Sequence, residues 1–356
     1  RAIGEPANPT LAVKTIAATN VHKLNRIICR SIVGLRARLN AFLSDLGLRL
    51  AKRSKNFSKS IIDAAARVAK ASSARTLMVY ADAIPNLDDL VSAVKPPTEL
   101  VVVTRSESDV ARVKERGIKQ LAVPSFNLTR MGQIKMATLM AFSQGMLKGG
   151  DVFVFVTGVI GQQIDTLVVM EVGHEYELFQ SVGQPKLTEH IRRVVFQRVL
   201  TLALEIAHEG REGKPIGTLI VVGDYREVQK QCQQNIINPF KGYREKERNV
   251  LDDRMRDTFK EFAHIDGAFV IKGNGVIMSA GTTLGPNVAG TSMPQGLGAR
   301  HAAAASITAA TKSIALTVSE STGAIRIWRR GKMITEIEKA PPSPKHTSAS
   351  NANEPT

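Results

Sequence analysis

The chain has 356 residues, enough for about two domains of ordinary size. Its 43% apolar and 22% charged residues are typical of a soluble globular protein with a full hydrophobic core. The longest nearly continuous apolar run, Val152 to Ile160, is too short for a membrane span of roughly 20 residues, so no membrane association is expected. The two cysteines, Cys29 and Cys232, are too far apart in the sequence to form a disulfide framework or a zinc-binding motif. This cysteine usage favours a reducing, cytoplasmic location.

The net charge of +16 is concentrated at the start of the chain. Residues 1–60 contain twelve Lys or Arg against two acidic residues, so they carry +10 of it. Residues 1–55 are therefore interpreted as a basic leader: a helical arm, a surface for acidic partners, a partly disordered segment, or a transit peptide that would direct the protein to an organelle. The remaining +6 is too evenly spread to predict a nucleic-acid partner.

Residues 56–183 alternate between helical patterns and short apolar strands. Continuous apolar strands are typical of a parallel sheet that helices cover on both faces, so we predict a parallel-sheet α/β domain here. Its expected helices are Ser58–Ala71, Asn86–Val94, Glu107–Arg116 and Met131–Leu147, and its expected strands are Thr76–Tyr80, Leu100–Val103, Gln120–Val123 and Val152–Val156.

Residues 184–335 form a second predicted domain, with a mixed-sheet α/β pattern. It opens with a helix from a candidate N-cap at Thr188 to Gly210, a residue type that commonly ends helices. The further elements expected are strand Thr218–Val222, loop Asn238–Gly242, helix Arg248–Phe262, strand Ala268–Lys272, turn Gly273–Asn274, strand Val276–Ser279, an Ala-rich helix from about Arg300, and strands Ile314–Val318 and Ala324–Trp328. Residues 336–356 are predicted to be a disordered tail.

Several common catalytic patterns are absent from the sequence. The stretch "GREGKPIG" at Gly210 has the wrong spacing for a phosphate-binding P-loop, and His301 stands where a dinucleotide fingerprint needs its third glycine. "HEYEL" at His174 lacks the second histidine of a zinc protease, and no GxSxG elbow occurs.

Two clusters in the second domain remain as a candidate site. In "HIDGAFVI", Asp266 precedes Gly267-Ala268 at the start of a strand, where a ligand can approach the backbone closely; the alternative is that Asp266 only caps a turn. In "GLGARHAAAASIT", Gly296 and Gly298 lead into a helix that begins with Arg300 and His301.

A glycine-rich turn before a helix exposes backbone N–H groups to an anion, and the Arg300 guanidinium matches phosphate; the alternative is a surface arginine at a helix start. Together, a carboxylate and a phosphate cradle are the minimum requirement for metal-assisted transfer on a nucleoside triphosphate.

The second domain resembles the diadenylate cyclase family over about Leu187 to Lys332. The resemblance rests on "GREGKPIGTLIVVGD", "NPFKG", "DGAFVI" followed by "SAGTTL", "GLGARHAAAASIT" and "TVSESTGAIRIW", in that order. The first domain resembles the C-terminal α/β domain of pyruvate kinases, including "LKGGDVFVFVTG" at Leu147–Gly158. The combination is similar to the archaeal-type architecture of the cyclase family.

This resemblance implies that two ATP molecules condense to cyclic di-AMP and two pyrophosphates, at a site shared by two facing catalytic domains of a homo-oligomer. It implies that Asp266 activates the 3′-hydroxyl and binds Mg²⁺ or Mn²⁺, with Glu320 as a second candidate metal ligand. The residues it implies for binding the nucleotide and its phosphates are Gly267, Ala268, Gly296, Gly298, Ala299, Arg300, His301, Ser319 and Glu320.

Two positions depart from the family pattern. Ala302 follows His301 where many members have a second arginine, which implies either weaker ATP binding or a compensating cation such as Lys272 or Lys312. Ile265 stands where some relatives have a histidine, which argues against His264 as a metal ligand. The alternatives are a nucleotide-binding sensor that lacks the chemistry and a basic nucleic-acid-binding protein.

Overall fold

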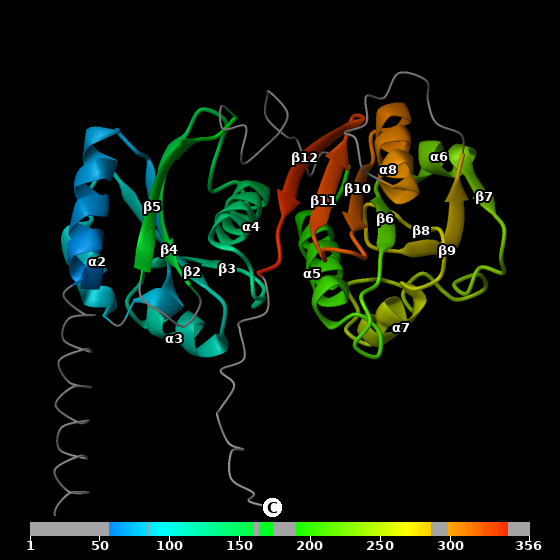
Figure 1. Ribbon diagram of the computed structural model, residues 1–356, viewed down its shortest axis with the longest axis horizontal. Coiled ribbons are helices and arrows are strands. Elements are labelled where there is room, and N and C mark those ends of the chain that lie inside the picture. Colours follow the sequence, from blue (N-terminus) through cyan, green and yellow to red (C-terminus); the bar gives the residue numbers. More distant parts are fainter. Residues whose placement is uncertain (1–56, 85, 160–163, 174–189, 286–297, 341–356) are drawn as a thin grey trace, which may run out of the picture. The chain divides into compact units, whose positions relative to one another are not determined.

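Two β-sheets, each covered by helices, make up the described part of this computed structural model (Figure 1). The structure describes residues 57–84, 86–159, 164–173, 190–285 and 298–340. The basic leader and the last 16 residues of the chain lie outside these ranges.

The first sheet has five strands in the order β3-β2-β1-β4-β5. β1, β2, β3 and β4 are parallel, as the apolar pattern predicted, whereas β5 runs antiparallel to β4 and was not foreseen. Edge strand β5 is only partly buried, and its apolar run of residues 167–170 is flanked by polar residues. The strands are β1 (Thr76–Tyr80), β2 (Glu99–Thr104), β3 (Lys119–Ala122), β4 (Val152–Gly158) and β5 (Ile164–Glu171).

Helices of this first domain begin at polar caps that the sequence supplies. Asn86, Ser106 and Thr129 each accept a hydrogen bond from a backbone N–H in the first turn of the helix that follows. The helix α4 ends at Ser143, four residues before the expected end at Leu147. Residues 57–71 are helical, followed by η1 (Ala81–Ala83), α2 (Leu87–Ala93), α3 (Glu107–Glu115) and α4 (Arg130–Ser143).

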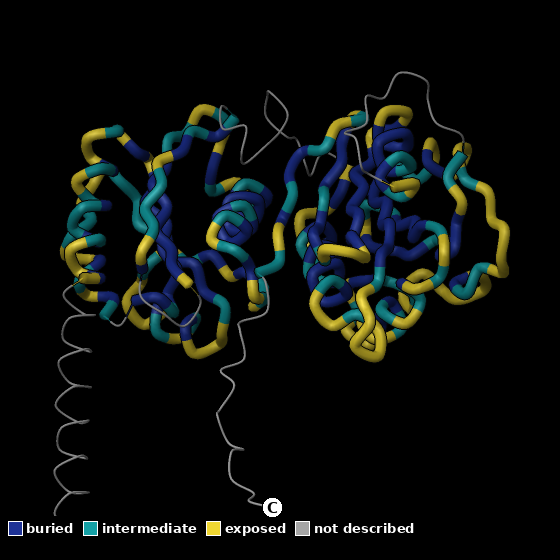
Figure 2. Tube along the Cα trace, viewed as in Figure 1, coloured by how far each residue is buried: buried dark blue, intermediate teal, exposed yellow. Residues whose placement is uncertain are grey.

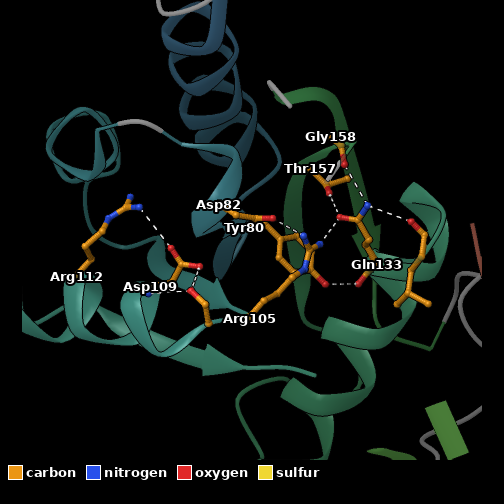
Figure 3. Close-up of polar contacts among 10 residues, drawn as sticks. Tyr80, Asp82, Arg105, Asp109, Arg112, Gln133, Thr157 and Gly158 are labelled. Atoms are coloured by element: carbon orange, nitrogen blue, oxygen red, sulfur yellow. Dashed lines mark hydrogen bonds and ion pairs between the residues drawn. The ribbon is translucent and has the colours of Figure 1, made fainter. Parts of the chain in front are cut away.

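A buried polar cluster lies where β1, β2 and β4 end (Figure 3). Gln133, on the first turn of α4, is only 2% exposed, and its Oε1 accepts from Arg105 Nη2 at 2.6 Å and from Thr157 Oγ1 at 2.8 Å. Arg105 also pairs with Asp82 at 2.5 Å and stacks on the Tyr80 ring at 3.8 Å. Burial raises the pKa of Tyr80 to about 12, so its hydroxyl stays protonated and donates to the Gln133 carbonyl.

The second sheet has seven strands in the order β12-β11-β10-β6-β8-β9-β7. Only β6 and β8 are parallel neighbours, and the other pairs are antiparallel, which confirms a mixed sheet. β12 extends to Ile337, two residues into the segment predicted as a tail. The strands are β6 (Thr218–Val222), β7 (Cys232–Gln234), β8 (Ala268–Ile271), β9 (Ile277–Leu284), β10 (Ile314–Val318), β11 (Ile325–Arg329) and β12 (Lys332–Ile337).

The helices of the second domain are α5 (Arg193–Glu209), α6 (Tyr225–Val228), η2 (Gln229–Gln231), α7 (Met255–Phe262) and α8 (Ala299–Ala310). Gly210 ends α5 with a φ of 61°, as predicted, whereas the candidate cap Thr188 lies outside the described residues and α5 starts after Arg192. The predicted helix Arg248–Phe262 is wrong in its first half, because residues 248–254 form turns.

Helices α5 and α8 cover opposite faces of the second sheet. Alternate residues of β6 separate accordingly: Ile220 packs in the core cluster that contains α5, and Leu219 packs with Ala304 and Ala305 of α8. Figure 2 shows the resulting pattern, with the central strands of both sheets dark blue and many connecting loops yellow, whereas the edge strands β5 and β7 are only partly buried or exposed. In the part of the chain that the structure describes, no helix has the length and hydropathy needed to cross a membrane.

We expect Gln133→Leu to lower the free energy of unfolding by about 2–4 kcal/mol, because the Arg105 guanidinium, the Thr157 hydroxyl and the Gly158 carbonyl each lose a buried partner. Thr157→Val removes one hydroxyl and leaves the Arg105–Gln133 bond, so its effect should be smaller. Urea unfolding of both variants measures the difference. Equal stability of Gln133→Leu and the wild type would contradict a structural role for this cluster.

Candidate functional site

A cavity of about 390 Å³ lies at the edge of the second sheet where β6 and β8 begin. This volume is within the range of small-ligand sites. The cavity is bounded by the end of β9 and the first turn of α8 as well. Its lining residues are Leu219, Asp266, Gly267, Ala268, Thr282, Thr283, Leu284, Gly285, Ala299, Arg300, Ala302 and Ala303.

The exposed carboxylate of Asp266 is held at the cavity by the close approach of two glycines. Gly267 has a φ of 108°, and a Cβ added to it would lie 2.7 Å from the Gly281 carbonyl carbon. Gly281 itself has a φ of 64° beside an irregularity in the β8–β9 pairing. Both conformations are ones that other residues rarely adopt, so the "DGA" and "SAG" stretches depend on each other.

Arg300 reaches the same cavity from the start of α8, where the first backbone N–H groups have no partner within the helix. Its guanidinium lies 3.4 Å from the carboxylate of Glu320, and its side chain is 38% exposed. A Cβ on Gly217 would collide with Arg300 Nη1 and lie 3.1 Å from Glu320 Cβ. The guanidinium therefore occupies a space that only a glycine at position 217 leaves open.

His301 points elsewhere, although it follows Arg300 directly. It is 9% exposed, its ring centroid lies 6.1 Å from that of Trp328, and its Nε2 accepts a hydrogen bond from Arg326 Nη1 at 3.0 Å. Burial, followed by the charges of Arg326 and Arg300, lowers the pKa of His301 to about 4. At neutral pH the imidazole is uncharged and does not line the cavity.

The other predicted site residues are distributed around the cavity. Gly298 is the N-cap of α8, and Gly296 lies outside the described residues. Ser319 is 8% exposed at the end of β10, where its hydroxyl lies 3.2 Å from that of Ser321. Neither Ser319 nor Glu320 lines the cavity, although Glu320 forms an ion pair with Arg300, which does line it.

Neither expected compensating cation lines the cavity. Lys272 follows β8 at the end opposite Ala268 and pairs with Glu245 at 2.5 Å. The backbone N–H of Lys312 donates to the Asp224 carboxylate beyond the end of α8. Ala302, at the position where a further arginine was expected, lines the cavity together with Ala303. His264 lies 2.8 Å from Arg211 and also does not line the cavity.

Sequence reasoning missed Leu219 and the β9 side of the cavity. Thr282 is 2% exposed, and its hydroxyl bonds to Ser279 at 2.6 Å and to Gln234 at 3.1 Å, so it is fixed in place. Thr283 is exposed at the same edge. The signal was the stretch "SAGTTL", which is rich in small and hydroxyl residues and lies within β9.

The donor set fits a divalent ion that is shared with phosphate. Mg²⁺ is commonly bound through one or two protein carboxylates plus substrate phosphates, and Asp266 supplies one such carboxylate. No group of three or more His, Cys, Asp or Glu side chains suited to a metal occurs among the described residues. The described lining of the cavity thus offers a single carboxylate, a guanidinium and a helix N-terminus rather than a complete metal cage, and Glu320 is engaged with Arg300.

Each of the two α/β domains matches a family model, and the model that matches the domain with this cavity is a nucleotide-binding one. The family model described as "DisA bacterial checkpoint controller nucleotide-binding" matches residues 205–333. A second family model, "Probable sensor domain DacZ_P", matches residues 58–179.

Two curated relatives define the family more closely. A diadenylate cyclase of Methanocaldococcus jannaschii is 37% identical over 195 residues, which cover 51% of this chain and 60% of that protein. A diadenylate cyclase of Haloferax volcanii is 35% identical over 204 residues, which cover 56% of this chain and 72% of that protein. The chain belongs to the diadenylate cyclase family, and its match spans only three fifths of the first of these relatives.

Solved structures give weaker likenesses. A hypothetical membrane spanning protein from Bacillus cereus is 22% identical with a TM-score of 0.32, covering 42% of this chain and 65% of that one. A double mutant of DacA from Staphylococcus aureus is 26% identical with a TM-score of 0.29, covering 39% of this chain and 84% of that one. With scores this low, neither structure carries an argument about the site. The likeness of the first domain to pyruvate kinase stays a prediction.

The low pKa of His301 predicts an acid-sensitive fold. Because the folded pKa, about 4, lies below the ordinary value of 6.5, this residue's contribution to stability is full above pH 6.5 and is lost as the pH falls toward 4. His301→Gln keeps an acceptor for Arg326 without titrating. We expect the urea midpoint to fall less between pH 7 and pH 5 in this variant than in the wild type. Identical falls would show that His301 does not titrate as described.

Proposed function

We propose that this chain condenses two ATP molecules into cyclic di-AMP, with release of two pyrophosphates. The observation that carries this is the meeting of Asp266 and Arg300, far apart in sequence, at one cavity of a chain in the diadenylate cyclase family. The names of both relatives support the reaction.

In the proposed reaction each 3′-hydroxyl oxygen attacks the α-phosphorus of the other ATP, and the bond from that phosphorus to pyrophosphate breaks. Asp266 accepts the hydroxyl proton, and its exposed carboxylate allows the proton to leave to solvent. Arg300 and the free N–H groups at the start of α8 stabilise the charge that develops on the phosphate oxygens. A bound Mg²⁺ or Mn²⁺ would add neutralisation of the triphosphate, held by Asp266 together with phosphate oxygens.

The two substrates are identical, so we further propose that two copies of this chain face each other, each holding one ATP. A two-fold arrangement places both 3′-hydroxyls and both α-phosphates in equivalent positions. The open cavity, with Asp266 exposed, supports access from outside the domain.

Residues 58–179 are proposed to act as a sensor that regulates the cyclase. The family description that matches this region supports the proposal. The cytoplasmic location stays a prediction.

One observation favours a second candidate, a nucleotide-binding protein of the same fold without the chemistry. Ala302 lines the cavity at the position where the family often has a further cation, and neither Lys272 nor Lys312 replaces it. Such a protein would bind ATP and form no product.

Asp266→Asn tests the enzymatic proposal. We expect cyclic di-AMP formation to fall on the order of 10²-fold or more, because the amide is neither a base nor a good metal ligand. Chromatography of reactions with ATP and Mn²⁺, Mg²⁺ or EDTA measures the product. Asp257→Asn is the matched control, since its carboxylate is 89% exposed on α7 and outside the cavity. Normal turnover in Asp266→Asn would refute the assignment, and ATP binding without product in the wild type would support the second candidate.

Gly217→Ala tests the position of Arg300. The new methyl group must displace the flexible end of Arg300, so we expect the rate to fall about 10–10²-fold while the melting temperature changes by less than about 4 °C. Adding Gly217→Ala to Arg300→Ala should have no further effect, because the displaced group is already gone. Two losses that multiply would show that Gly217 acts by another route.

A further inference from the structure

A second cavity, also of about 390 Å³, lies in the first domain and is separate from the candidate cyclase site. One wall is the second half of the helix of residues 57–71, and the other is the segment that joins α2 to β2. All of its lining residues belong to the described part of the chain.

The hollow arises because the helix presents small side chains here. Asp63, Ala66, Arg67 and Lys70 follow the i, i+3, i+4, i+7 spacing of one helix face. Ala66 leaves the space that a larger residue would fill, so the floor is apolar and the charged groups stand at the rim.

The opposite wall is fixed before any ligand arrives. The Thr98 hydroxyl donates to the Ala74 carbonyl at 3.0 Å, and the Glu99 N–H donates to the Arg75 carbonyl at 2.8 Å. Pro96 and Pro97 further restrict the backbone of this segment. Because this wall is preformed, the protein loses little conformational entropy when a ligand binds.

The charges around this cavity do not balance. Arg67, Lys70 and Lys95 face it with Asp63 as the one carboxylate in its lining. The ion pairs that the structure describes in this domain use other cations, namely Arg75, Arg105, Arg112, Arg116, Lys119, Arg130 and Lys135. The rim therefore has an excess of two positive charges over an apolar floor.

We propose that this cavity binds a small dianion with an apolar body, either a phosphate ester or a dicarboxylate. Two negative charges neutralise the excess of the rim, and an apolar body displaces water from Ala66 and Val94. The three cations are exposed, so each contributes modestly, and a dissociation constant on the order of 0.1–1 mM is expected. If residues 58–179 act as the proposed sensor, this ligand is the signal, but binding itself does not depend on cyclase activity.

Phenyl phosphate is the probe for a phosphate ester, and phthalate is the probe for a dicarboxylate. Two controls each lack one feature: phenol has the apolar ring without the charge, and inorganic phosphate has the charge without the ring. Saturation-transfer NMR on the full-length chain measures binding. We expect at least one of the two aromatic dianions to bind, and the one that binds more tightly identifies the ligand class. Phenol and inorganic phosphate should bind at least tenfold more weakly. No binding of either aromatic dianion to the wild type would overturn the proposal.

Two variants locate the probe. Arg67→Gln/Lys95→Gln should weaken binding about tenfold, whereas the control Lys59→Gln/Lys114→Gln, which removes two exposed cations outside the cavity, should leave it within about twofold. Ala66→Leu keeps every charge and fills the hollow, so it should also abolish binding. Three outcomes would overturn the assignment. They are equal weakening of probe binding in both double variants, full probe binding by Ala66→Leu, and a loss of probe binding that occurs only in Arg300→Ala. Formation of cyclic di-AMP is measured in a separate assay, so these binding results can be interpreted even if the cyclase proposal fails.

Discussion

The close approach of Gly267 to Gly281 is the contact on which the candidate site depends. Both residues have positive φ, and a side chain on Gly267 would overlap the backbone of the neighbouring strand. Without this contact β8 and β9 could not bring Asp266 beside Thr282 and Thr283 at one rim. The acidic group is thus placed by backbone geometry, and its exposure leaves it accessible to a substrate.

The cationic side of the cavity is organised in a different way. Arg300 is restrained by Glu320 and by the absence of a side chain at Gly217, while His301 is turned inward against Trp328 and Arg326. Glu320 therefore orients the guanidinium in this structure, and its predicted role as a metal ligand would require it to leave that pair. The arrangement leaves Arg300 as the cation that lines the cavity among the described residues.

Charged side chains of the first domain serve two different purposes. The Arg105 side chain is 6% exposed; Asp82 neutralises its charge, and Gln133 and the Tyr80 ring contact its guanidinium, so it serves the fold. The cations around the first-domain cavity have no such partners among the described residues, and this difference separates a structural cluster from a candidate ligand site.

Periodicity in the sequence was sufficient for the elements that are buried along their length. β1, β6 and β10 are buried at every position, and their bounds agree with prediction because a continuous apolar run leaves little choice. β5, β7 and β12 were missed because they are edge strands, or close to an edge, with mixed polarity. α7 was predicted too long because residues 248–254, which are mostly polar, suit turns as well as a helix.

By itself the sequence determined that a carboxylate follows one turn and that an arginine opens a helix. Tertiary structure decided that both reach one cavity, since Asp266 and Arg300 meet only after β8, β9 and α8 pack together. It also decided that His301 does not join them. Successive residues of a helix point about 100° apart, so the sheet that α8 covers takes one of these neighbours into the core and leaves the other at the cavity.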